Sequence, residues 1–175
     1  MSASRPVQLT PHEVLIDAPR ELAFQVMTAF GRGRIQGMNE RSNVLERDGN
    51  RLVVEFVTDA VVRKYTTVEE VVLHPPERID FKHLTGPFQE ASEVFTFTET
   101  PDGKTVLRHT GEFVLGWPLV GRAVGSSVTK RWFERVMKRH MAQMKEAIEA
   151  RAARSHVFRR NRPAAPAGPD DSASG

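Results

Sequence analysis

Cysteine is absent from this sequence of 175 residues, which excludes disulfide bonds and thiolate metal sites. No apolar run is long enough to span a membrane. The first residues, MSASRPVQLT, also lack the charged and apolar blocks of a secretion signal. Together these absences predict a cytoplasmic protein.

Positive charge is in excess only near the C-terminus. The net charge is +3, and lysine and arginine balance aspartate and glutamate over residues 1–150. The excess comes from five arginines in residues 151–162, set against Asp170 and Asp171. Such a tail could make weak contact with an anionic membrane, or it could be only a solvated end. Because the rest of the chain is neutral and offers no positive groove, we expect no specific nucleic-acid partner.

The length predicts a single domain with loose ends. Residues 1–6 are expected to be flexible, and residues 7–154 to form the folded domain. Residues 155–175 are basic and rich in proline, alanine and glycine, so they are expected to be a disordered tail.

The longest periodic pattern runs from Ser126 to about Arg154 and predicts a long C-terminal helix. Its apolar residues recur at spacings of three and four, which places them on one side of a helix. They form two registers: Trp132, Val136, His140, Met144 and Ile148 in one, and Phe133, Met137 and Met141 in the other. Charged residues cover the opposite side. A helix of this length needs a broad apolar partner, and only the segments upstream can supply one.

Alternating patterns upstream of this helix predict β-strands. The expected strands cover residues 7–16, 44–46, 51–57, 63–73, 78–84, 90–99 and 105–115, and a short helix covers 19–29. Consecutive hairpins imply an antiparallel sheet with one face in solvent and the other covered by the long helix. The predicted fold class is therefore α+β with two layers. A curved sheet that grips one helix tends to leave a space for a small apolar ligand.

Several segments resemble the START-like superfamily, also called SRPBCC, which includes polyketide cyclases/dehydrases and coenzyme Q-binding proteins. They are IDAPRELAFQV at 16–26, VLERDGNRL at 44–52, HPPERIDFKHLTGPF at 74–88, FTFTETPDGKTVLRHTGEF at 95–113 and PLVG at 118–121. The resemblance covers residues 12–152 and implies the helix-grip fold, a curved antiparallel sheet wrapped around a long C-terminal helix. Residues 32–38 depart from it, because coenzyme Q-binding relatives usually carry a Tyr-Pro and a Trp-containing loop there.

Strand alternation and the helix pattern indicate which side chains would line a cavity. The expected lining consists of Tyr65, Phe81, His83, Phe95, Phe97, His109, Phe113, Trp132, Val136 and His140. Residues 31–38 and 116–125 would control access to it. Arg63 could hold an anionic head group or lie on the rim.

Three of the polar residues are candidates for chemistry: His83, Glu93 and His109. A His–Glu or His–His pair in a dry cavity can transfer protons, and the resemblance implies that cyclases of this fold orient a poly-ketone with such groups. Each could equally be a half-buried polar residue with a local hydrogen bond. The six histidines show no pair at ligand spacing, so neither a metal site nor a cofactor is expected.

These observations favour a protein that binds a hydrophobic small molecule for transport, sensing or chaperoning. The ligand classes are a lipid, an isoprenoid or quinone, or a polyketide. The alternative is a cyclase or dehydratase that uses His83, Glu93 and His109. A third hypothesis is a ribosome- or protein-interaction module, as the resemblance to the coenzyme Q-binding group suggests.

Overall fold

A computed structural model describes residues 6–32, 40–59, 64–86, 88–114 and 122–160 of the chain. The elements in chain order are β1 (Val7–Gln8), β2 (His12–Ile16), α1 (Arg20–Met27), β3 (Glu40–Asp48), β4 (Arg51–Asp59), β5 (Lys64–His74), β6 (Arg78–Thr85), β7 (Glu90–Glu99), β8 (Thr105–Val114) and α2 (Arg122–Arg160). The expected order of strands, short helix and long helix is therefore present.

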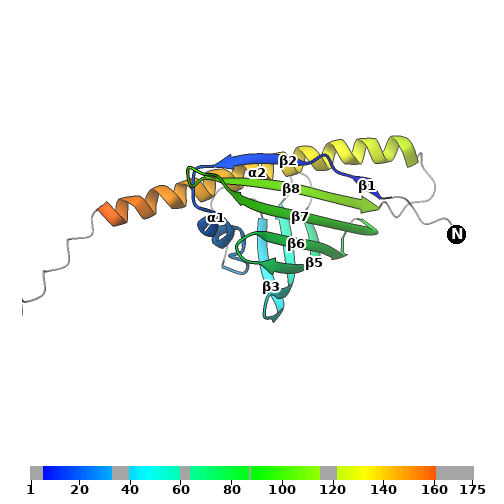
Figure 1. Ribbon diagram of the computed structural model, residues 1–175. Helices are drawn as coiled ribbons and strands as arrows, with labels where there is room; N and C mark the ends of the chain where they lie inside the picture. Colours follow the sequence, from blue (N-terminus) through cyan, green and yellow to red (C-terminus); the bar gives the residue numbers. More distant parts are fainter. Residues whose placement is uncertain (1–5, 33–39, 60–63, 87, 115–121, 161–175) are drawn as a thin grey trace, which may run out of the picture.

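The strands form one antiparallel sheet in the order β1-β8-β7-β6-β5-β4-β3, and β2 pairs with β8 as well. From β3 to β8 each strand pairs with its neighbour in sequence, so hairpin connections suffice. At the β3–β4 turn, Gly49 adopts a positive φ of 56°, which a residue with a Cβ rarely tolerates. The sheet curves, with α2 running along it beside β2 (Figure 1). The predicted α+β helix-grip fold is confirmed.

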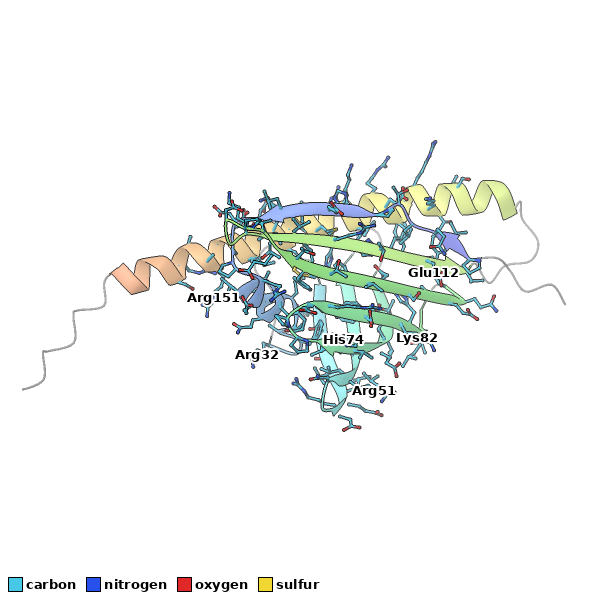
Figure 2. The ribbon with its side chains drawn as sticks, viewed as in Figure 1. Arg32, Arg51, His74, Lys82, Glu112 and Arg151 are labelled. Atoms are coloured by element: carbon cyan, nitrogen blue, oxygen red, sulfur yellow. The ribbon has the colours of Figure 1, made fainter. Side chains whose placement is uncertain are left out.

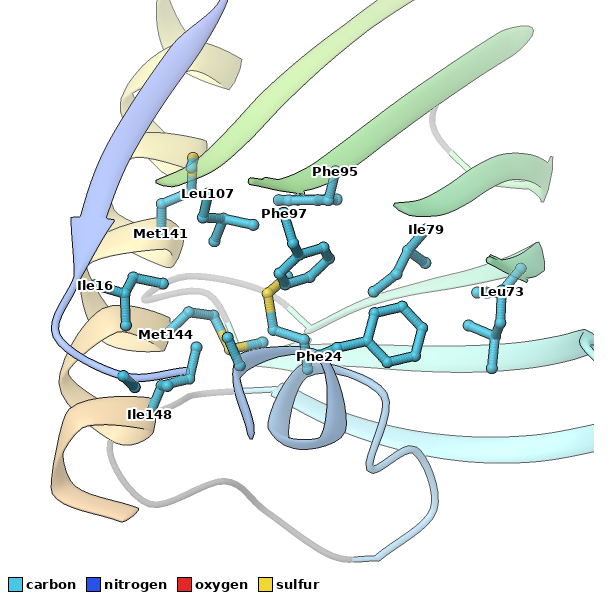
Figure 3. Close-up of a cluster of buried hydrophobic side chains, with 14 of the residues drawn as sticks. Ile16, Phe24, Leu73, Ile79, Phe95, Phe97, Leu107, Met141, Met144 and Ile148 are labelled. Carbon is cyan, nitrogen blue, oxygen red and sulfur yellow. The ribbon is translucent and has the colours of Figure 1, made fainter. Parts of the chain in front are cut away.

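The main hydrophobic core lies between the sheet and the two helices. Phe24 of α1, Leu107 of β8 and Met141 of α2 belong to this cluster, and Figure 3 shows their side chains within it. Burying a side chain of this size contributes about 1.5–3 kcal/mol relative to leaving it exposed. Helix α1 packs against both α2 and β7, so it covers one end of the core between the sheet and α2.

The opposite face of the sheet is polar. Lys82 of β6 and Glu112 of β8 alternate with buried-face residues and project outward, as Figure 2 shows. This alternation is that of an antiparallel sheet with one wet face.

Several boundaries differ from the expected ones. The expected strand 7–16 is two short strands, because Pro11 lies between β1 and β2 and cannot donate a ladder hydrogen bond. Strand β3 begins at Glu40, and α2 continues to Arg160 instead of ending near Arg154. The predicted tail is thus helical at its start, while residues 161–175 lie outside the described residues.

The face that α2 presents to the sheet also requires a correction. Trp132 and Val136, expected to line a cavity, are 51% and 45% exposed. The buried side of α2 takes Phe133 and Met141 from the second register and Met144 and Ile148 from the first. Trp132 and Val136 instead share the solvent side with exposed Val128 and basic residues.

Within the described residues, no helix has both the length and the apolar character that crossing a membrane requires.

Candidate functional site

A row of four ionisable side chains crosses the buried face of the sheet; we call it the polar belt. Its members are Glu69 of β5, His83 of β6, Glu93 of β7 and His109 of β8. Each continues the alternation of the apolar residues on its own strand, so the same local rule that builds the core also turns these side chains inward.

Direct contacts link the members of the polar belt. His109 Nε2 lies 2.8 Å from Glu93 Oε2, and His83 Nε2 lies 3.4 Å from Glu93 Oε1. His83 Nε2 is also 3.3 Å from Glu69 Oε1, which accepts a 2.9 Å hydrogen bond from the Thr67 hydroxyl. An ionised carboxylate only accepts, so the histidines place their Nε2–H groups toward the glutamates.

The polar belt is well shielded from solvent. The side chain of His109 is 2% exposed and that of His83 is 8% exposed. Along β7, Glu93 separates Phe95 of the main core from Ala91 of a second apolar cluster, which also contains Phe113 and Phe133. The ionisable groups therefore lie between two apolar clusters, where charges persist only when paired and hydrogen-bonded.

Gly111 of β8 makes room for Glu93, its direct partner across the β7–β8 pairing. A Cβ added at Gly111 would lie 2.8 Å from the Ser92 carbonyl oxygen and 3.2 Å from Cγ of Glu93. Because the first distance is shorter than real Cβ contacts allow, a larger residue would push the backbone or the carboxylate out of place.

Electrostatic coupling within the polar belt shifts its pKa values in opposite directions. Burial alone would raise the pKa of Glu93, but the hydrogen bonds from His109 and His83 outweigh it and lower this pKa to about 2. Burial would lower the pKa of His83, yet the hydrogen bond to Glu93 and the charges of Glu69 and Glu93 raise it. Both shifts favour an ionised Glu93 beside a protonated His83.

His140 of α2 approaches the polar belt from the helix side. Burial lowers the pKa of His140, and the charges of Glu93 and His109 also act on it. The shift at His140 favours the uncharged imidazole, which is the opposite direction from His83.

These shifts predict how stability depends on pH. Glu93 titrates below its ordinary value of 4.5, so its contribution is complete above pH 4.5 and is lost as the pH falls toward 2. The loss should be about 3 kcal/mol, at about 1.4 kcal/mol per pKa unit. The raised pKa of His83 makes its contribution complete below pH 6.5 and lost as the pH rises through the folded-state value. Urea unfolding across this range, compared with a Glu93→Gln variant, would measure the effect. An acid limb of equal size in both proteins would contradict the prediction.

The structure brings together the three residues that the sequence singled out for chemistry. His83, Glu93 and His109 converge, and Phe81, Phe95, Phe97 and Phe113 share their face of the sheet. Tyr65 lies at the start of β5, where side chains are not described, and Arg63 lies outside the described residues. Most of the expected entrance segments, 33–38 and 116–121, also lie outside them.

Glu69 was missed by the sequence analysis, although a signal for it existed. Tyr65 was expected to face the cavity, and continuing the alternation along this strand by four residues reaches Glu69. In the sequence alone, a glutamate at that position is typical of a solvent-facing residue. Its pairing with His83 across β5 and β6, which places it on the buried face, is known only from the structure. Among the described residues, no group of three or more potential ligand side chains is arranged to hold a metal ion.

The fold and the inward-facing polar belt place the chain among helix-grip proteins of the START-like class. Residues 9–149 match the family of polyketide cyclase / dehydrase and lipid transport proteins, and the chain belongs to this family. No curated protein matches it in sequence.

Solved structures share the fold at low sequence identity. A protein from Thermus thermophilus superposes with a TM-score of 0.71 at 19% identity, covering 83% of this chain and 99% of its own. The Zhui aromatase/cyclase from Streptomyces sp. R1128 gives 0.67 at 22% identity, covering 86% and 95%. A START superfamily protein from Mycobacterium smegmatis gives 0.61 at 15% identity, covering 85% and 99%. At these identities the likeness establishes the fold alone.

Proposed function

We propose that this protein binds a hydrophobic small molecule between the sheet and α2, with an oxygen-bearing end of the ligand directed at the polar belt. The observation that carries the proposal is the burial of His83, Glu93 and His109 between two apolar clusters. Apolar side chains of similar volume would cost less there, because burying charges carries a desolvation penalty. A family described by polyketide cyclisation and lipid transport handles ligands of this kind.

The affinity would come mainly from apolar burial. Each Å² of ligand surface removed from water contributes roughly 25 cal/mol before ordering costs are subtracted. The polar belt would add orientation, since a few placed polar groups in an apolar site fix which end of a ligand enters first.

Native mass spectrometry of the freshly purified protein, before and after solvent extraction, tests the proposal. We expect a defined apolar mass that leaves on extraction, or rebinding of added lipid, quinone and polyketide-like compounds by the extracted protein. Binding should weaken in a His83→Leu/His109→Leu variant. It should persist in Lys82→Ala, which changes the outward face of the same strand. A folded protein that retains no mass and binds none of the compounds would contradict the proposal.

A cyclase or dehydratase is the second candidate, favoured by the convergence of groups with opposite pKa shifts. Cyclisation with dehydration needs a base that removes a proton beside a carbonyl and an acid that protonates the departing hydroxyl. His83, whose pKa is raised, suits the acid, and His140, whose pKa is lowered, suits the base. Glu93, with a pKa of about 2, would position the histidines and would not exchange the proton itself.

Mass spectrometry of the recovered compound distinguishes a carrier from an enzyme. A linear poly-ketone incubated with the protein should be recovered unchanged from a carrier, whereas an enzyme would release it with the mass of one water lost. Loss of turnover in the His83→Leu/His109→Leu variant would favour the enzyme. Unchanged turnover in that variant would contradict a cyclase or dehydratase that uses these residues.

A further inference from the structure

An apolar stripe lies on the solvent side of the first half of α2. Val128, Trp132 and Val136 recur at intervals of four residues and are 63%, 51% and 45% exposed. Phe133 packs inward against Phe113, with ring centroids 6.0 Å apart, and this contact helps to fix the rotation of the helix that leaves the stripe outside. Single exposed apolar residues are common, but three in line on one helix are typical of an interaction surface.

A basic stripe runs beside the apolar one. Arg131, Arg135 and Arg139 each follow a member of the apolar stripe by three residues, so the two stripes are neighbours on the helix surface. All three arginines are exposed, and none of the ion pairs formed among the described residues involves them. The helix runs along one margin of the molecule (Figure 1), which leaves its outer face accessible to a large partner.

The single acidic residue within residues 127–140 is already engaged. Glu134 accepts a 2.9 Å hydrogen bond from the backbone N–H of Thr10, and its carboxylate lies 3.7 Å from the Lys130 ammonium. The same fourteen positions carry five lysines and arginines, so positive charge is in clear excess. A partner for this face must therefore combine negative charge with an apolar component.

An anionic lipid bilayer meets both requirements. Its head groups pair with arginines, and its acyl chains accept apolar side chains, which is how basic amphipathic helices lie on membranes. Trp132 suits the boundary between the two layers, because its ring is apolar and its indole N–H needs a polar partner. A second copy of the chain fits less well, since pairing the face with itself brings two sets of arginines together. The helix also presents its side chains as a ridge, which a flat, deformable surface can meet without the matching groove that an acidic protein would need.

We propose that the exposed face of α2 from Val128 to Arg139 is a membrane-docking surface that binds the head-group region of an anionic bilayer. Its arginines contact the lipid phosphates, and Trp132 inserts at the level of the head groups. This surface is distinct from the basic tail, whose arginines lie in residues 151–162. The inference goes beyond the proposed function and does not depend on it, because docking requires no bound molecule.

Flotation of the full-length protein with unilamellar vesicles tests the docking surface. One set of vesicles contains only phosphatidylcholine, and the other also contains about 30% phosphatidylserine. We expect the partition coefficient to be at least about tenfold larger for the anionic set. Binding should fall steeply between about 0.05 M and about 0.5 M salt, because salt screens exposed charges.

Substitutions on α2 separate the apolar and the basic contributions. Trp132→Ala should weaken binding to anionic vesicles by roughly tenfold, and it should leave the fold intact because the side chain is half exposed. Removing the basic stripe should weaken binding by more than about tenfold, since each arginine near an anionic surface contributes roughly fivefold. The variant is Arg131→Gln/Arg135→Gln/Arg139→Gln.

Two variants with the same loss of charge serve as matched controls, and both should retain most of the binding. The first removes three exposed basic residues of the sheet: Arg41→Gln/Arg47→Gln/Lys82→Gln. The second removes three arginines of the tail: Arg159→Gln/Arg160→Gln/Arg162→Gln.

Tryptophan fluorescence locates the contact. In a Trp117→Phe background Trp132 is the only tryptophan, and its emission should move to shorter wavelength with anionic vesicles and stay unchanged with neutral ones. Unchanged emission with anionic vesicles, absence of flotation with them, or equal flotation with both sets would overturn the assignment. A loss of binding in the sheet control equal to that in the α2 variant, or a loss only in the tail variant, would overturn it too. So would a dimer, seen by light scattering, that dissociates in Trp132→Ala. None of these outcomes bears on the binding of a hydrophobic molecule, which native mass spectrometry tests separately.

Discussion

Replacement of Glu93 by alanine is expected to lower the free energy of unfolding by about 3–5 kcal/mol at neutral pH. The carboxylate is the only group in the polar belt that contacts both His83 and His109 among the described residues. Without it, His83 keeps only its contact with Glu69 in the polar belt, and His109 loses its 2.8 Å partner inside an apolar layer. Urea unfolding followed by circular dichroism, with linear extrapolation to water, measures the change.

Glu99 provides the matched control, because it is an exposed glutamate on the same strand. Glu99→Ala should change the unfolding free energy by less than about 0.5 kcal/mol. A cycle with Glu93→Ala, His109→Ala and the double variant should show a coupling of roughly 0.5–3 kcal/mol, as residues in one buried network do. Similar losses at positions 93 and 99, or no coupling, would mean that the polar belt is not an energetic unit.

Replacement of Met141 by alanine is the second large effect that we expect, with a loss of about 2–5 kcal/mol. Met141 is fully buried, and its neighbours in the main core come from the sheet, from α1 and from α2 itself. The substitution would leave a cavity between α2 and the sheet that these rigid elements cannot close. Thermal and urea unfolding of the variant would give the magnitude.

Trp132→Ala is the contrasting variant on the same helix. Tryptophan is the larger side chain, yet Trp132 is 51% exposed, so its removal should cost less than about 0.5 kcal/mol. A larger loss for Trp132→Ala than for Met141→Ala would show that α2 is rotated about its axis in solution relative to the structure described here.

The two candidate functions place different demands on the polar belt. A carrier needs His83 and His109 held in fixed orientations, which the contacts with Glu93 provide. An enzyme also needs one group that gives a proton and another that takes one at the same pH. The opposite pKa directions of His83 and His140 meet that second demand, so the belt is compatible with both functions, and product analysis separates them.

The fold class and the inward face of the strands were predictable from the sequence. Side chains alternate along a strand, so His83 is predicted on the same face as Ile79 and Phe81. For the same reason Glu93 is predicted on the face of Phe95 and Phe97. The turn residues between the strands predicted that consecutive strands pair as hairpins. These are local properties of the chain, which is why a single sequence was sufficient for them.

The register of α2 was not predictable in the same way. Both of its apolar registers fit one side of a helix at spacings of three and four, and the buried side draws on both: Phe133 and Met141 from one, Met144 and Ile148 from the other. The shape of the sheet and the position of α1 decide that the first register is exposed at Trp132 and Val136 and buried further along the helix.

Periodicity within each element was enough to predict an antiparallel sheet, a long terminal helix and a set of inward polar residues. That Glu69, His83, Glu93 and His109 form one connected row depends instead on the cross-strand register between segments distant in the chain, which follows from the folded arrangement. The same arrangement leaves Nδ1 of His83 buried without a partner among the described residues. Contacts between elements, unlike the pattern within each one, exist only once the chain has folded.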